Sequence, residues 1–185
     1  MRKLKSLFVI LALVFVFGIH NNLHAQDEAV ISVTYYLDGA EVNSQTPSPL
    51  NVGVTVNINV PTINGSFLFW TVNGAVRRDL PQNPIIKATS KLHMVAHYAS
   101  ADKKVVVFLD SNLQLLKVEF LENETPTPPA APTKPLATNL GWALITDYNT
   151  VVTPSLPESG VVYYVAKYSL NTGDSPSVTL SVSDH

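Results

Sequence analysis

Two histidines of this chain have a spacing that is known from metal sites. His93 and His97 are four residues apart, which on a helix would place both rings on one zinc ion. On a strand they share a face but lie about 13 Å apart, too far to bind one metal. Because the surrounding run Leu92–Tyr98 is rich in β-forming residues, we expect both histidines to be exposed strand residues and predict no metal site.

Carboxylates and basic residues offer two further candidate sites. Asp38 and Asp110 follow similar apolar runs, but acid–base catalysis needs both carboxylates in one cleft. Turn capping explains each aspartate separately. Arg77, Arg78 and Lys87 form the only local basic cluster of the first half, which we interpret as a solvated loop. We find no pairing of a nucleophile with a base and no glycine-rich phosphate loop, so the sequence predicts neither enzymatic activity nor a cofactor.

The chain contains no cysteine, which excludes disulfides, thiolate zinc sites and thiol catalysis. Leu156-Pro157-Glu158-Ser159-Gly160 is similar to a sortase sorting signal. Such a signal needs a following apolar segment and a basic tail, and the sequence has neither, so we interpret these residues as a turn.

The N-terminus has the pattern of an export signal. Basic residues Arg2, Lys3 and Lys5 precede an apolar run from Leu7 to Ile19, as in a secretory signal peptide. The run is shorter than the roughly 20 residues that span a bilayer. We predict a signal peptide over residues 1–25, cleaved after Ala25, and a secreted or cell-surface protein; an uncleaved membrane anchor is the alternative.

Removing the signal peptide changes the charge of the protein. The full chain has 12 basic and 14 acidic residues. Residues 1–25 contain three of the basic residues and no acidic residue, so the mature chain has a formal charge of −5. This balance argues against a nucleic-acid partner bound by bulk charge. No later segment is long and apolar enough to span a membrane, so we expect no membrane insertion after the signal is removed.

The mature sequence repeats itself at an interval of about 70 residues. Leu37 and Leu109 are 72 residues apart, Trp70 and Trp142 are also 72 apart, and Tyr98 and Tyr168 are 70 apart. We therefore predict two tandem units, residues 26–100 and 101–170, joined through 99–103 and followed by a tail over 171–185. We expect these three residue pairs to be structural core residues, although exposed tryptophans could also stack on a sugar or a protein partner.

Strand patterns dominate both units, and no amphipathic helix longer than three turns is recognisable. The Pro-rich segment 126–132 is interpreted as an extended crossover inside the second unit. Turns are indicated at Asp38-Gly39, Asn64-Gly65, Asn73-Gly74 and around Asp110. Apolar and alternating patterns predict strands at Ile31–Tyr36, Val52–Val60, Leu92–Tyr98, Lys104–Leu109, Leu115–Phe120 and Val161–Tyr168.

The second unit has a series of recognisable motifs: the strand Val107–Asp110, the proline segment Pro129–Pro135, the pair Gly141-Trp142 and the closing run Val165–Tyr168. Through these motifs it resembles the Listeria–Bacteroides repeat of the internalin B-repeat type. The first unit resembles the family more weakly, through Pro61-Thr62, the Gly65–Trp70 segment and Val95–Tyr98. Two segments depart from the family pattern. Before Trp142, the segment Leu136–Leu140 replaces the Gly-Tyr-x-Phe of the family, and before Trp70, Phe69 replaces the family's Gly.

The resemblance implies a small β-grasp-like domain that serves as a module of surface and secreted proteins and has no catalytic residues. The predicted fold class is therefore mainly β, with two tandem β-grasp-like repeats. We expect a non-enzymatic binding or adhesion module whose partner is an unidentified protein or glycan at a cell surface. The alternative is a structural spacer or assembly subunit that associates with itself through its C-terminal strand, Ser177–Ser183.

Overall fold

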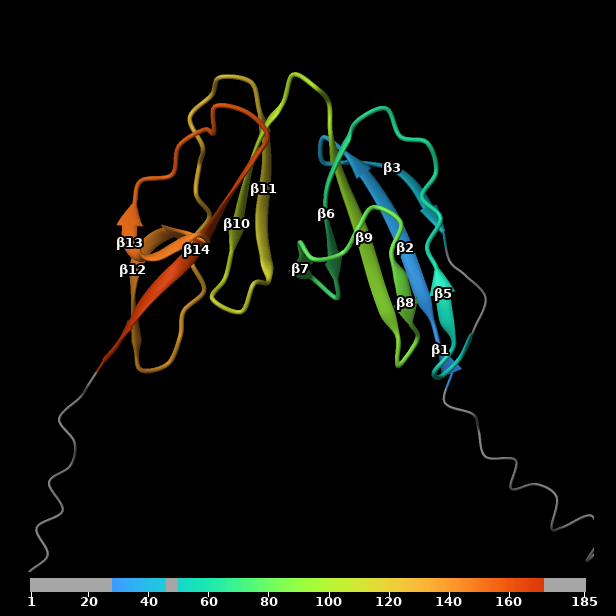
Figure 1. Cartoon of the computed structure of the whole chain (residues 1–185). Coiled ribbons are helices and arrows are strands. Elements are labelled where there is room, and N and C mark those ends of the chain that lie inside the picture. Colours follow the sequence, from blue (N-terminus) through green and yellow to red (C-terminus); the bar gives the residue numbers. More distant parts are fainter. Residues whose placement is uncertain (1–27, 46–49, 172–185) are drawn as a thin grey trace, which may run out of the picture.

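The computed structural model describes residues 28–45 and 50–171 (Figure 1). The described residues form fourteen β-strands and no helix. The strands make up two five-stranded and two two-stranded sheets. The prediction of a mainly β fold is therefore confirmed. The predicted signal peptide and the predicted tail strand Ser177–Ser183 lie outside the described residues.

The first five-stranded sheet, here the first sheet, comes from the N-terminal half of the described chain. Its strand order is β3-β2-β9-β6-β7, and only the β2–β9 pair is parallel. Two short sheets, β1-β4 and β5-β8, accompany it. The bounds are β1 Glu28–Ala29, β2 Ile31–Leu37, β3 Ala40–Gln45, β4 Leu50–Asn51, β5 Thr55–Asn57, β6 Ser66–Val72, β7 Ala75–Arg77, β8 Ile85–Lys87 and β9 Leu92–Ala99.

The second five-stranded sheet, the second sheet, has the strand order β11-β10-β14-β12-β13, and only the β10–β14 pair is parallel. If the five strands of each sheet are numbered in chain order, both sheets have the same spatial order: second, first, fifth, third, fourth. The bounds are β10 Lys104–Leu109, β11 Leu115–Leu121, β12 Ala137–Leu144, β13 Asp147–Val152 and β14 Val161–Leu170.

Two hairpins of the first sheet turn where the sequence predicts. Asp38-Gly39 joins β2 to β3, and Asn73-Gly74 joins β6 to β7. All four residues have positive φ, between 49° and 83°, as a two-residue type I′ loop requires. Asp and Asn tolerate this left-handed conformation better than other side chains, and Gly adopts it freely.

The predicted strand Val52–Val60 is wrong over most of its length. Only Thr55–Asn57 is a strand, β5, which pairs with β8. The alternation fails because Val52 and Val54 are exposed, whereas Val56 and Ile58 pack against the core beneath. The other five predicted strands are found as β2, β9, β10, β11 and β14.

Buried side chains form three clusters. The first core lies on one face of the first sheet, around Tyr35 and Trp70, and the β5–β8 pair covers it through Val56 and Ile86. The third core lies on one face of the second sheet, around Phe108 and Trp142. Between the sheets lies a cluster to which both contribute, here the shared core: Phe69, Val76, Ala99, Val105, Val107, Leu109, Tyr163 and Val165.

The shared core joins the two halves of the described chain. Leu37 packs on the first core, but Leu109, its counterpart in the sequence repeat, packs on the shared core. The two leucines therefore lie on opposite faces of their sheets. A shift of strand register by one residue moves each side chain to the other face of the sheet. On the face opposite the shared core, Phe108 makes the contact that Tyr35 makes in the first sheet: each ring meets the tryptophan of its own half edge-on.

Backbone hydrogen bonds also join the two sheets. The Val76 N–H donates to the Leu113 carbonyl at 2.9 Å, and the Leu115 N–H donates to the Gly74 carbonyl at 2.9 Å. Ala75 and Gln114 form an isolated antiparallel bridge between these bonds. Figure 1 shows β7 beside the turn between β10 and β11. That turn therefore covers one edge of the first sheet.

Replacing Trp142 tests the third core. We expect Trp142→Ala to lower the free energy of unfolding by about 3–5 kcal/mol, because it leaves a cavity against Phe108 and Tyr164. Urea unfolding followed by far-UV circular dichroism measures the change. Tyr148→Ala, at an exposed aromatic residue, is the control and should change stability by less than about 1 kcal/mol. Equal stability of Trp142→Ala and the wild type would contradict the core assignment.

Candidate functional site

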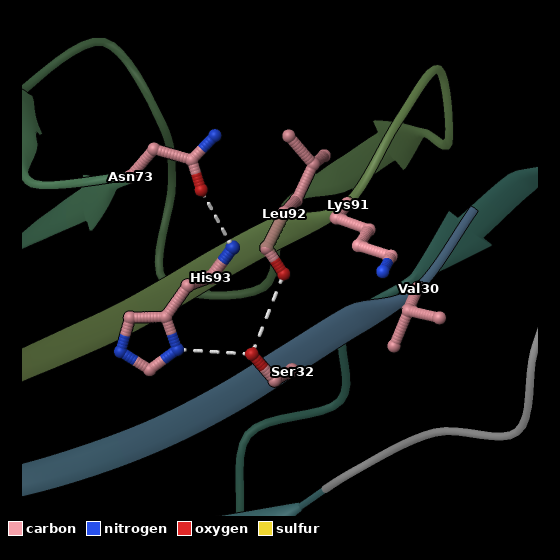
Figure 2. A pocket seen from close by; sticks show the side chains of 6 residues that line it. All are labelled: Val30, Ser32, Asn73, Lys91, Leu92 and His93. Carbon is pink, nitrogen blue, oxygen red and sulfur yellow. Dashed lines mark hydrogen bonds between the residues drawn. The ribbon is translucent and has the colours of Figure 1, made fainter.

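A pocket of about 350 Å³ opens at the beginning of the parallel strands β2 and β9. Figure 2 shows its lining, in which Val30 and Leu92 are apolar and Ser32, Asn73, Lys91 and His93 are polar. Asn73 comes from the turn between β6 and β7, so three separate segments of the first half form the pocket.

Hydrogen bonds fix the polar residues of this pocket. The Ser32 hydroxyl lies 2.9 Å from His93 Nδ1 and 3.4 Å from the Leu92 carbonyl, and the His93 backbone N–H donates to Asn73 Oδ1 at 2.8 Å (Figure 2). Ser32 and His93 are register partners in the parallel β2–β9 pair. Their contact is therefore a consequence of strand register, which brings together residues 61 positions apart.

The contact between a serine hydroxyl and an imidazole has the distance of a nucleophile and its base. Hydrolysis by such a pair also needs a carboxylate to orient the ring and donors that stabilise an oxyanion. The six residues that line the pocket include no carboxylate. Lys91, His93 and the Asn73 amide instead provide donors for a small polar group at an open surface. No local sequence pattern indicates this pocket, because the pocket depends on strand register.

The prediction that both histidines are exposed is correct for His93 and wrong for His97. His97 is 8% exposed and its ring stacks against Phe69 at 4.6 Å and against Tyr36 at 6.0 Å between centroids. The second sheet covers this side, since the Tyr163 ring meets Phe69 edge-on at 5.8 Å. A single unit would leave this face in water, which is why the expectation failed.

His97 is a buried polar side chain in an apolar setting. Its Nε2 has no hydrogen-bond partner in the described part of the structure. Burial lowers the pKa of His97 from 6.5 to about 4, because the charged imidazolium loses its hydration. The ring is therefore neutral at pH 7. Residues 28–45 and 50–171 contain no cluster of three His, Cys, Asp or Glu side chains that could hold a metal ion.

The two aspartates have separate structural roles: Asp110 caps its own turn, whereas the Asp38 side chain accepts from Ser100 in the segment after β9. Asp38 accepts hydrogen bonds from the Ser100 backbone N–H, at 2.9 Å, and from the Ser100 hydroxyl. This holds the segment that leads from the first sheet to the second. Asp110 Oδ1 accepts from the N–H groups of Asn112, at 2.7 Å, and Gln114, at 2.9 Å.

The three residues of the basic cluster are exposed to solvent, as predicted, but they do not form one loop, because Arg77 ends β7 and Lys87 lies on β8. Arg77 forms a two-point ion pair with Asp79, at 2.6 and 2.8 Å. Arg78 crosses to the other sheet and lies over the Tyr163 ring, 4.7 Å from its centroid. Lys87 lies on β8, where Thr55 is its register partner. The shared core brings Arg78 to Tyr163, which no pattern within one unit could indicate.

The expected core residues are buried to different degrees. Trp70, Trp142, Tyr98 and Leu109 are buried, whereas Leu37 and Tyr168 are half-buried at the edges of their clusters. The Trp70 indole donates to the Pro81 carbonyl at 2.9 Å, and the Tyr168 hydroxyl donates to the Pro132 carbonyl at 2.7 Å. These bonds hold neighbouring loop segments against the sheets. Both tryptophans are buried, so neither indole face is open to a sugar.

The sortase-like segment lies in the connection between β13 and β14. Leu156 packs against the third core, and Gly160 has a φ of 72° just before β14. These contacts agree with a structural turn, because the apolar residue is directed inward and glycine supplies the left-handed conformation.

No protein-family model and no curated protein matched this chain when it was compared with both. None of the residues that the structure describes belongs to a helix that could cross a bilayer.

The buried His97 predicts a loss of stability in mild acid. The unfolded chain binds a proton near pH 6.5 and the folded chain only near pH 4. The full stability is therefore present above about pH 6.5 and declines as the pH falls towards 4, by about 3 kcal/mol in total. Urea unfolding at intervals from pH 7.5 to 4.5 measures this slope.

His97→Phe should flatten that pH profile, because phenylalanine cannot be protonated and fits between two aromatic rings. His93→Phe, at an exposed position of the same strand, is the control and should retain the wild-type slope. Parallel profiles for the wild type and His97→Phe between pH 6.5 and 4.5 would contradict the buried, neutral histidine.

Proposed function

We propose that this chain is an exported, non-enzymatic binding or adhesion module made of two β-grasp-like repeats. The observation that carries the proposal is the outer edge of the second sheet, here the β13 edge, where Tyr148 and Val151 are exposed on β13 and Leu140 is exposed on the neighbouring β12. Apolar side chains gathered on an edge strand are a feature of interaction surfaces.

Several features support an origin by duplication. Both sheets place a parallel pair of first and last strands at the centre and a hairpin on each side, which is the strand order of β-grasp domains. Each tryptophan strand has a bulge just before the tryptophan, between Phe67 and Phe69 and between Asn139 and Gly141. In the register, Trp70 pairs with Ala96 and Trp142 with Ala166. Unrelated sheets would have little reason to share these irregularities.

Comparison of the four sheet edges favours β13 as the binding edge. The turn after β10 covers β7, and β11 packs side chains on both the shared and the third core. The β3 edge is exposed but mostly polar, Ala40-Glu41-Val42-Asn43-Ser44-Gln45. At β13, a partner strand could add to the backbone while Tyr148 and Val151 provide apolar contact. This mode suits a protein partner at a cell surface.

A second candidate function is assembly through the C-terminal segment. Leu136 and Leu170 are 78% and 80% exposed, and they lie together because the Asn171 N–H donates to the Leu136 carbonyl at 2.8 Å. The chain continues from this point into residues 172–185, whose sequence alternates around Val178, Leu180 and Val182. A neighbouring copy could cover the exposed leucines with these apolar residues.

Charge on the β13 edge should abolish adhesion. We expect labelled protein 26–185 to bind cells of the producing organism, and Tyr148→Lys/Val151→Lys to bind at least about tenfold more weakly, because an edge lysine opposes strand addition. Flow cytometry measures binding, and Val42→Lys on β3, also exposed, is the matched control. Equal binding by the double variant and the wild type would reject the β13 edge.

Sedimentation velocity separates the two candidate functions. Association that increases with concentration in the 26–185 protein and is absent from the 26–171 protein would support assembly through the tail. A monomer that binds cells in both forms would support adhesion.

A further inference from the structure

The boundary between the two sheets contains a pocket of about 320 Å³. Its apolar walls are Val76 from the first sheet and Leu109, Leu113 and Ile145 from the second half. Ligand pockets often lie where two packed bodies meet, and this volume is near the lower end of their usual range. Because both sheets contribute walls, the pocket exists only when they are docked.

The backbone holds one wall of this pocket in an unusual conformation. Leu113 has a φ of 62° and an exposed side chain, although leucine rarely adopts the left-handed region. Its carbonyl accepts the Val76 N–H at 2.9 Å, and its own N–H donates to the Asp110 carbonyl at 3.1 Å. These bonds keep an apolar side chain at the mouth of the pocket, where water would otherwise favour a polar residue.

The charges at the rim are unequal. Arg77, Arg78 and Asp79 complete the lining, and the Asp79 carboxylate is paired with Arg77 at 2.6 Å. Among the described residues, Arg78 forms no ion pair with a carboxylate. Its neighbour Tyr163 stays neutral at pH 7, because burial raises the pKa of that phenol to about 12. The rim therefore presents one net positive charge, on a guanidinium that can bind a carboxylate with two hydrogen bonds.

We infer that this inter-sheet pocket binds a small amphipathic carboxylate, with its chain or ring against Val76, Leu113 and Ile145 and its carboxylate on Arg78. Either a free organic acid or the C-terminal residue of a peptide has this chemistry. No residue that lines the pocket lies on β13, so a failure of this inference would leave the proposed adhesion function untouched.

Titration of the 26–185 protein with 3-phenylpropionate, followed by ¹H–¹⁵N NMR, tests the inference. Amide shifts should centre on Val76, Leu113 and Ile145. The uncharged analogue 3-phenylpropanamide should bind at least about tenfold more weakly, because it cannot pair with the guanidinium. Equal affinity for the acid and the amide, or shifts confined to other parts of the protein, would overturn the inference.

Variants assign the roles of individual residues in this pocket. Arg78→Gln should weaken binding of the acid at least about tenfold, whereas Lys87→Gln, at an exposed basic residue of β8 outside the pocket lining, should change it less than about threefold. Leu113→Asn should keep the fold, because asparagine tolerates the left-handed conformation, but weaken binding of both probes. Unchanged affinity in Arg78→Gln would reject the charge assignment.

A peptide ending in phenylalanine distinguishes the two sources of the ligand. Binding of the peptide acid more tightly than 3-phenylpropionate, and loss of binding in its C-terminal amide, would identify a reader of peptide ends. Weaker binding of the peptide acid than of 3-phenylpropionate would identify a site for free acids.

Discussion

The shared core between the two sheets is the constraint on which the rest of this structure depends. Each five-stranded sheet has two apolar faces, and the loops of its own half cover only one of them. The second faces of the two sheets pack against each other. This packing buries Phe69 and Ala99 of the first sheet and Val107 and Leu109 of the second. Units of about 70 residues bury a small fraction of their surface and are only marginally stable, so an apolar face left in water would weaken them further.

The functional features follow from this packing. His97 is buried and neutral because the sheet face on which it lies is covered. The pocket beside Arg78 has walls from both halves, and the turn after β10 covers the β7 edge. On the second sheet, β13 lies at the opposite edge from β11 and keeps exposed apolar side chains. One buried interface thus determines which surfaces remain for partners.

The sequence predicts several strands correctly, but it does not predict which segments lie beside them in the folded protein. Lys104–Leu109 was predicted to the residue, because five consecutive apolar residues mark a strand. The same apolar run indicates more than a strand. A strand with a continuous apolar sequence is covered on both faces, which implies that a second layer packs on the sheet. Strands β3 and β13 are not predicted because their side chains are almost all exposed and show no alternation. The tryptophan strands β6 and β12 are not predicted either, and in each a bulge interrupts the alternation of side chains. The Ser32–His93 contact and the position of Arg78 depend on register and docking, which no local pattern encodes.

The most direct test of the shared core uses the two tryptophans as separate reporters, since Trp70 lies in the first core and Trp142 in the third. Trp142→Phe leaves fluorescence from the first half alone, and Trp70→Phe leaves it from the second. Urea unfolding of each variant should be followed by both fluorescence and circular dichroism. If the sheets unfold as one unit, the two signals coincide within each variant. Fluorescence and circular dichroism transitions that separate within either variant would contradict the shared core as the interaction that holds the protein together.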